Sequence, residues 1–181
     1  MRNYKEEYER WLDSPALSEK EWAELDAISG DDQEIKNRFF APLEFGTAGL
    51  RGTMKLGLHN MNVHIIRHAT QAFANVICAE GKEAMDKGIV IAHDCRINGV
   101  TFAKEAACVM AANGIHVRIF ESLRPTPELS FAVLHYGTTA GLNITASHNP
   151  KEYNGYKVYW SDGAQLPPHK AEEAEIGRAH V

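Results

Sequence analysis

Apolar positions recur with a helical spacing in the middle of the chain. Between residues 62 and 85 they lie three, four and seven positions apart and form one stripe, which contains Ile65, Ala69, Ala72 and Val76. A second row, Ile66, Phe73 and Ile77, lies beside it. This pattern predicts one long amphipathic helix over 62–85.

The first 42 residues carry shorter helical patterns. The segment Ser18-Glu19-Lys20-Glu21 is a capping box, in which the serine hydroxyl accepts the amide of Glu21 and the Glu21 carboxylate reaches back. One or two further turns are expected between Asp31 and Phe40. We therefore predict an N-terminal helical cap over residues 1–42.

Short apolar runs alternate with helical segments after residue 88. The runs at 89–92, 115–120 and 140–145 are typical of buried strands, and helices are expected over 101–112 and 126–136. Such alternation indicates βαβ units. The predicted fold class is α/β: a mainly parallel (mixed) sheet with helices on both faces, preceded by the helical cap.

Local signals refine two boundaries. Thr126-Pro127-Glu128 predicts a helix start with Thr126 as the N-cap and Pro127 at the first helical position. Asn154-Gly155 predicts a turn before a last strand over 156–160.

Three loops follow predicted strands, at 94–98, 124–126 and 146–149. Ligands of open α/β sheets bind beyond the carboxyl ends of the strands. We expect these loops to share one rim of the sheet.

Composition narrows the class of protein. The 181 residues are 44% hydrophobic and 24% charged, which is typical of a single globular domain. A net charge of -5 argues against a general nucleic-acid binder. The sequence has no apolar run long enough for a membrane span and no signal-peptide pattern at its start. Its three widely spaced cysteines fit free thiols in a reducing compartment, so we expect a cytoplasmic location.

Ser147 is the best candidate nucleophile. It follows a predicted strand, between Ala146 and His148, and Pro150 stops any regular continuation. A turn serine that bonds its own backbone is the alternative that local sequence favours. A serine hydrolase is a weaker interpretation, because the G-x-S-x-G nucleophile elbow is absent.

The glycine-rich loop over 46–52 can bring backbone amides and the Arg51 guanidinium close to an anion. It matches neither the dinucleotide fingerprint nor the nucleotide P-loop, and a tight turn is the alternative. His64 and His68 stand four residues apart, as metal ligands on a helix do. The Glu of H-E-x-x-H is missing between them, so an ordinary helix pair is favoured.

Three segments together resemble the α-D-phosphohexomutase family, and in particular its bacterial phosphoglucomutase branch related to phosphopentomutases. They are Phe45-Gly-Thr-Ala-Gly-Leu-Arg-Gly52, Leu123-Arg-Pro-Thr-Pro-Glu-Leu129 and Thr145-Ala-Ser-His-Asn-Pro-Lys-Glu-Tyr-Asn-Gly-Tyr-Lys-Val-Tyr159. The serine segment is the most specific. The segment His93-Asp-Cys-Arg96 departs from the family, whose members commonly have serine at the position of Cys95.

The resemblance implies a role for each matching residue. Ser147 corresponds to the phosphorylated serine, whose phosphoryl oxygen binds Mg²⁺. His148 would assist proton transfers, and Lys157 would be a general acid or base and a substrate contact. Arg51 would be both catalytic and substrate-binding. Thr47 and Asn149 would bind substrate.

The resemblance also implies the reaction and its partners. Phosphoserine would give its phosphoryl group to glucose 1-phosphate, and the glucose 1,6-bisphosphate formed would return the other group and release glucose 6-phosphate. The bisphosphate is therefore expected as activator and intermediate, and sugar phosphates as partners, with no nucleic acid or membrane. A phosphopentomutase, a phosphomannomutase and a non-catalytic sugar-phosphate-binding module are the alternatives.

Family members have four domains, and this chain resembles domain one, over residues 43–174. Domains two to four of the same polypeptide would supply the remaining Mg²⁺ ligands and the sugar-binding loops, so we expect the fragment alone to be inactive. The tail over 175–181 resembles the in-frame translation of a sequencing-adapter oligonucleotide and is expected to be non-native.

Overall fold

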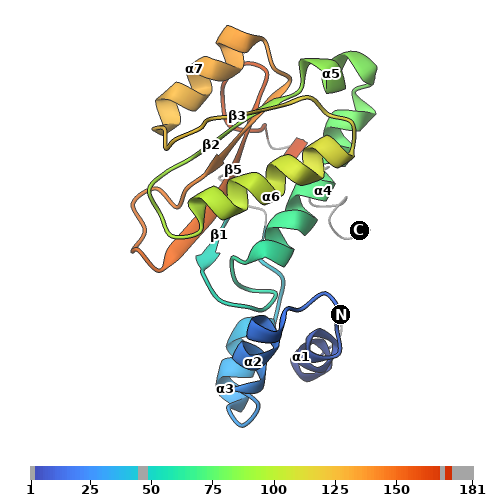
Figure 1. Cartoon of the computed structure of the whole chain (residues 1–181), viewed down its shortest axis with the longest axis vertical. Helices are drawn as coiled ribbons and strands as arrows, with labels where there is room; N and C mark the ends of the chain where they lie inside the picture. Colours follow the sequence, from blue (N-terminus) through green and yellow to red (C-terminus); the bar gives the residue numbers. More distant parts are fainter. Residues whose placement is uncertain (1–2, 45–48, 168–169, 173–181) are drawn as a thin grey trace.

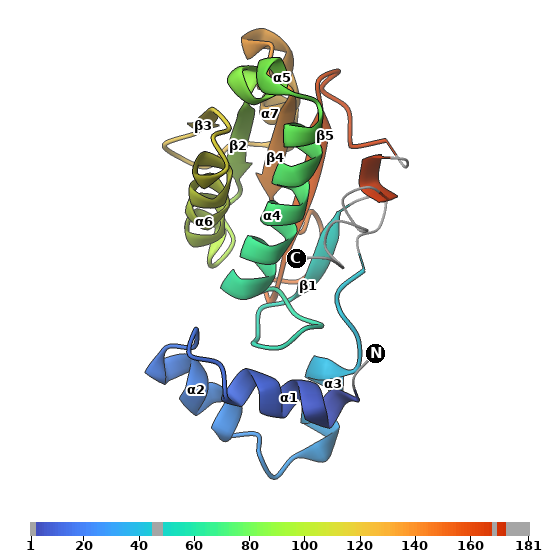
Figure 2. The ribbon, with the colours of Figure 1, turned by 90° about the vertical axis from the view of Figure 1, so that its right-hand side faces the viewer.

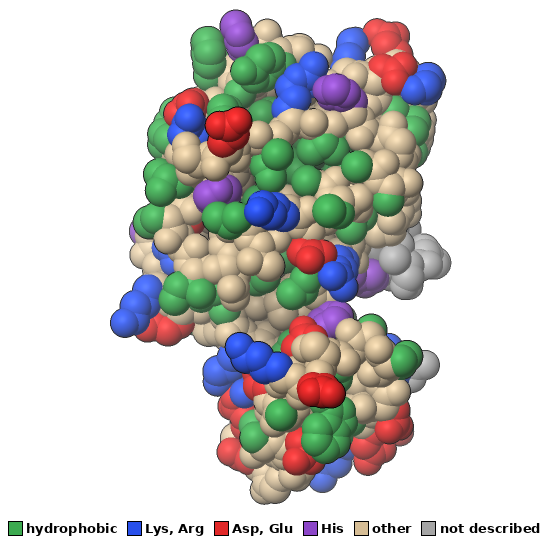
Figure 3. All heavy atoms as spheres, viewed as in Figure 1, with side chains coloured by type: hydrophobic (Ala, Val, Ile, Leu, Met, Phe, Trp, Pro, Cys, Tyr) green, Lys and Arg blue, Asp and Glu red, His purple; other side chains and the backbone are tan. Residues whose placement is uncertain are grey.

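The computed structural model describes residues 3–44, 49–167 and 170–172 of the chain. Helices of the N-terminal cap gather at one end of the molecule, and a five-stranded sheet with its covering helices forms the other (Figures 1 and 2). On the face that Figure 3 shows, acidic side chains gather around the cap. The predicted α/β class with a preceding helical region is confirmed.

The cap contains the helices α1 (Tyr4–Leu12), α2 (Glu19–Asp26) and α3 (Asp32–Phe39). The predicted capping box of α2 is present: the Glu21 amide donates to Ser18 Oγ, and the Ser18 amide donates to Glu21 Oε2 at 2.9 Å. Aromatic rings of α1 pack edge-on against Phe39 of α3, and the Tyr8 hydroxyl donates to the Leu25 carbonyl. The three helices thereby share buried apolar side chains, which are continuous with the main core of the molecule.

The sheet contains the strands β1 (Leu50–Thr53), β2 (Ile89–His93), β3 (Val117–Ile119), β4 (Ala140–Ile144) and β5 (Tyr153–Trp160), in the spatial order β1-β5-β4-β2-β3. β2 pairs in parallel with both β3 and β4, whereas β5 runs antiparallel to β4 and to β1. The sheet is therefore mixed, as predicted, with its parallel part at the centre and at β3.

Helices cover both faces of this sheet, as predicted. On one face lie α4 (Val63–Ala79) and α6 (Gly99–Ala112), whose apolar side chains share the main core with the sheet. On the other face lies α7 (Thr126–Tyr136), packed over Val90, Ala92 and Tyr159. This leaves β1 and the start of β5 beyond the reach of α7's apolar contacts.

The predicted helix over 62–85 is wrong in its length. The chain leaves α4 after Ala79, turns at Gly81 and begins the short helix α5 (Lys82–Lys87). Gly81 has a φ of 93°, in the left-handed region that glycine adopts without strain. The backbone conformation of Gly81 therefore ends the helix, although the helical pattern of apolar residues continues beyond it.

The predicted turn before the last strand and the predicted N-cap of α7 are also wrong. Asn154 and Gly155 lie inside β5 and form no turn before it. The N-cap of α7 is Pro125, with Thr126 already helical, and the Thr126 hydroxyl accepts a hydrogen bond from the Asn143 side chain. The glycine-rich segment is likewise a strand from Leu50 onward, while its residues 46–48 lie outside the described part.

Candidate active site

The loops after β2 and β4 meet at one rim of the sheet, as predicted. The Thr145 hydroxyl donates to Asp94 Oδ2 at 2.5 Å, and the Asp94 amide donates to the Ile144 carbonyl. The third loop joins them through the Arg124 amide, which donates to the His93 carbonyl at 3.0 Å. Loops far apart in the sequence thus form a single edge.

Ser147 stands at the exposed tip of this rim. Its backbone has a φ of 57°, one of two left-handed non-glycine residues in the described part of the chain. That conformation costs about 1–2 kcal/mol for an L-residue. The Ser147 amide donates to Thr145 Oγ1 at 3.0 Å. The loop therefore keeps this serine at the surface in a strained conformation, and His148 beside it is also exposed.

Arg51 and Lys157 come from adjacent strands and lie on the same face of the sheet. Arg51 pairs with Gly155 in the register of β1 and β5, and Lys157 is two residues further along β5. Tyr159, the next residue on that face, packs beneath α7, which identifies the face. Arg51 Nη1 donates to Asn149 Oδ1 at 3.2 Å, so the cationic strand face formed by Arg51 and Lys157 is in direct contact with the serine loop, residues 145–153.

The electrostatics of this face act on Lys157. Partial burial lowers the pKa of its ammonium group, and the Arg51 charge lowers that pKa further. Both causes disfavour the protonated form, so Lys157 releases its proton more readily than an exposed lysine does. Arg51 also lines a pocket of about 270 Å³ with Thr53 and Tyr153.

Arg96 is the site residue that sequence reasoning missed. Its side chain is 11% exposed, and its guanidinium donates to four backbone carbonyls of the serine loop. The residue types around it gave no local signal, although Arg96 ends the segment His93–Arg96, which continues from β2 into the following loop. Neighbouring Cys95 is exposed.

Two of the remaining sequence candidates, Thr47 and the tail over 175–181, lie outside the described residues. His64 Nε2 lies 3.0 Å from Glu21 Oε1, and its ring packs edge-on against Trp11, so it ties α4 to the cap. Among the described residues, no three His, Cys, Asp or Glu side chains gather as metal ligands. None of the helices in that same part is long and apolar enough to cross a membrane.

Known proteins resemble this chain over most of its length. Residues 42–178 match the family model described as phosphoglucomutase/phosphomannomutase, alpha/beta/alpha domain I. A mouse phosphopentomutase is 39% identical over 88% of this chain and 27% of its own length. A phosphoglucomutase of Staphylococcus aureus (strain USA300) is 44% identical over 79% of this chain and 25% of its own length.

A solved structure agrees. A Thermus thermophilus protein assigned as a phosphomannomutase superposes with a TM-score of 0.68 at 31% identity, over 75% of this chain and 30% of that one. The chain therefore spans about a quarter of the length of the curated relatives it matches.

Proposed function

The chain belongs to the phosphoglucomutase/phosphomannomutase family, as its domain I, and on this premise we propose that it carries the phosphoserine of a sugar phosphomutase. The reaction interconverts glucose 1-phosphate and glucose 6-phosphate through glucose 1,6-bisphosphate. The observation that carries the proposal is Ser147, held exposed in a left-handed conformation beside Arg51 and Asn149.

Charge at the rim supports phosphoryl transfer. A phosphoserine carries about -1.5 to -2 charges at pH 7 and three acceptor oxygens. Arg51 supplies planar N–H donors that match a phosphoryl group, and Lys157 adds a second cation on the same face. Transfer of a phosphoryl group depends mainly on such positioning and charge stabilisation.

Each transfer balances through groups on this rim. A sugar hydroxyl oxygen attacks phosphorus, the bond from phosphorus to Ser147 Oγ breaks, and the serine oxygen takes up a proton. The attacking hydroxyl gives its proton to a base. Lys157, with its lowered pKa, and His148, beside the serine, are the groups we propose for these proton transfers. Return of the second phosphoryl group from the bisphosphate restores phosphoserine.

Mg²⁺ is proposed to bind a phosphoryl oxygen on Ser147, where it would neutralise developing charge. Asp94 is the carboxylate of the rim network, but both of its oxygens already accept hydrogen bonds from the chain. The described residues thus fit the ion through the phosphoserine alone, and domains two to four would supply its other ligands and the sugar contacts. We propose residues 43–174 as domain one, residues 1–42 as its cap and 175–181 as a non-native tail.

The identity of the sugar in the substrate needs its own test, since similar relatives include both a phosphopentomutase and a phosphoglucomutase. Comparison of kcat/KM for glucose 1-phosphate and ribose 1-phosphate decides it. A higher value for the pentose phosphate would assign a phosphopentomutase.

The test uses the complete polypeptide encoded by the gene. After incubation with glucose 1,6-bisphosphate, mass spectrometry should find phosphate on Ser147. Ser147→Ala should lower kcat on the order of 10⁴-fold or more, as loss of a covalent nucleophile does. Ser161→Ala, at an exposed turn, is the matched control. Normal turnover in Ser147→Ala would remove the serine's role, and saturable sugar-phosphate binding without turnover in the unmodified protein would favour a binding module.

A further inference from the structure

The rim holds two arginines that could both be taken for phosphate ligands, Arg51 and Arg96. We propose that Arg96 is instead a positioning residue: it fixes the backbone of the serine loop, residues 145–153, and does not bind the substrate phosphate. This inference rests on the proposed function for Ser147. It identifies Arg96 as the residue that holds the loop in which that serine lies.

Four of the five N–H donors of the Arg96 guanidinium donate to backbone carbonyls of the protein. Nη1 donates to the carbonyls of Pro150 at 2.8 Å and Tyr153 at 2.9 Å. Nη2 donates to the carbonyls of Ser147 at 2.9 Å and Asn149 at 2.7 Å. A guanidinium has five N–H donors, and these four bonds leave only Nε.

Asp94 forms an ion pair with the guanidinium, since Arg96 Nε lies 3.3 Å from Asp94 Oδ2. The same carboxylate accepts the Arg96 amide at 2.9 Å and the Thr145 hydroxyl, which in turn accepts the Ser147 amide. Both polar groups of the Ser147 backbone are therefore fixed, its carbonyl by Arg96 and its N–H through Thr145. This explains how the strained φ of Ser147 persists.

Arg51 is bound differently. Within the described part of the chain the structure gives its side chain one hydrogen bond, to Asn149 Oδ1. Its other N–H groups stay available to a phosphoryl oxygen, whereas Arg96 would have to abandon a backbone carbonyl to reach one.

The anchoring through the backbone has a functional consequence. Ser147 is phosphorylated at one stage of the reaction and free at another, so its side chain must change charge. Because Arg96 contacts the Ser147 carbonyl and not Oγ, the loop keeps the same hydrogen bonds at both stages. A displaced loop would misalign the transfer, and a misplacement of about 1 Å costs roughly 10²-fold in rate.

The first test is kinetic, with Arg96→Lys in the complete polypeptide. Lysine has three donors on one nitrogen and cannot span four carbonyls. We expect kcat to fall on the order of 10²-fold, with KM for the sugar phosphate changed by less than about threefold. Arg118→Lys, a half-buried arginine on β3 that donates to the Lys87 carbonyl, is the matched control with unchanged kcat. An unchanged kcat in Arg96→Lys, or a selective rise in KM, would overturn the proposal.

The second test is hydrogen exchange on the 181-residue chain. In Arg96→Lys we expect the amides of residues 147–153 to exchange at least about tenfold faster, with those of β2 unchanged. Arg118→Lys should leave both segments unchanged. Faster exchange across β2 as well would mean that Arg96 holds the fold and not the loop, which contradicts the proposal. If the unmodified polypeptide shows no mutase activity, the proposed function fails, while this exchange experiment still decides the role of Arg96.

Discussion

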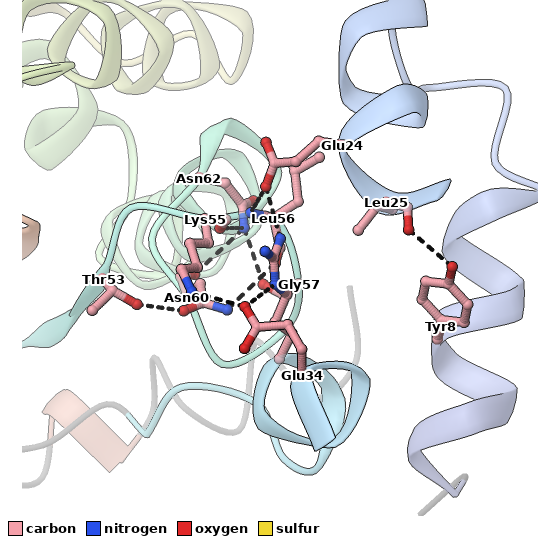
Figure 4. A network of polar contacts seen from close by, with 11 residues as sticks. Tyr8, Glu24, Leu25, Glu34, Thr53, Lys55, Leu56, Gly57, Asn60 and Asn62 are labelled. Atoms are coloured by element: carbon pink, nitrogen blue, oxygen red, sulfur yellow. Dashed lines mark hydrogen bonds and ion pairs between the residues drawn. The ribbon is translucent and has the colours of Figure 1, made fainter. Parts of the chain in front are cut away.

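Two loops in this chain are each held by an arginine, the buried Arg38 and the half-buried Arg96, and the two arginines use different partners. At the junction loop, residues 54–62, Arg38 donates to the carboxylates of Glu24 and Glu34. Those carboxylates then accept the Leu56 amide and the Lys55 ammonium group (Figure 4). In the serine loop, Arg96 donates directly to backbone carbonyls.

The two loops also differ in how far they are buried. The junction loop buries Leu56 and Met61, and Asn62 donates to the Lys55 and Gly57 carbonyls. It therefore joins the cap to the sheet as part of the core. The serine loop leaves Ser147 exposed and strained. The difference teaches that the junction loop supports stability, whereas the serine loop, under the proposed function, presents the nucleophile, so substitutions should separate the two effects.

The largest effect on stability is expected at Gly57 in the junction loop. Its φ is 118°, and an added Cβ would lie 2.7 Å from both Cβ and the carbonyl oxygen of Arg38. Gly57→Ala should lower the free energy of unfolding by about 3 kcal/mol in urea denaturation, because strain and a backbone clash add. Gly30→Ala, where an added Cβ meets nothing within 4 Å, should change it by less than about 0.5 kcal/mol. Equal stabilities of the two variants would refute the comparison.

A smaller effect of opposite sign is expected in the serine loop. Ser147→Gly relieves about 1–2 kcal/mol of left-handed strain and loses about 0.5–1 kcal/mol through the flexibility of glycine. The chain should gain up to about 1.5 kcal/mol in the same denaturation experiment, while phosphoryl transfer by the complete polypeptide is lost. Ser147→Ala keeps the Cβ and should show no gain. A destabilised Ser147→Gly would show that the serine side chain supports the fold.

The smallest effect is electrostatic and concerns Lys157. Arg51→Gln should raise the Lys157 pKa, but not to its ordinary value, because burial is the larger cause of the lowering. Titration of the Lys157 side chain by NMR measures this, with Arg118→Gln as the control that leaves the Lys157 pKa in place. The folded chain binds this proton more weakly than the unfolded chain, so the lysine's contribution to stability rises with pH between its two pKa values. If the Lys157 pKa is unchanged in Arg51→Gln, the Arg51 charge does not act on this lysine.

Much of the fold is predictable because local pattern and tertiary packing agree there. The apolar runs of β2 and β4 lie within fully buried strands, and α7 ends at Tyr136 before Gly137, as predicted. The position of Ser147 at the rim follows from the same strand order. These elements need no information beyond their own sequence.

The failures arise where distant residues decide the local structure. Gly155 lies inside β5, where an added Cβ would meet the Thr145 and Leu50 carbonyl oxygens at 2.6 and 2.9 Å. Its glycine is required by two neighbouring strands and not by a turn. Asn154 is fully buried and donates to the Ile97 carbonyl. The carbonyl groups that Arg96 contacts lie more than 50 residues further along the chain, so no local pattern could identify them.

The position of β5 between β1 and β4 has a consequence for folding. Leu50 pairs with Tyr156, and Arg51 contacts Asn149, so the site joins segments about a hundred residues apart in the sequence. Such distant pairing must overcome a large loop-closure entropy and is slow compared with helix formation. During synthesis the parallel strands β2, β3 and β4 can associate before β5 has left the ribosome. The cationic face beside Ser147 is therefore completed only when residues 153–160 pair with both β4 and β1.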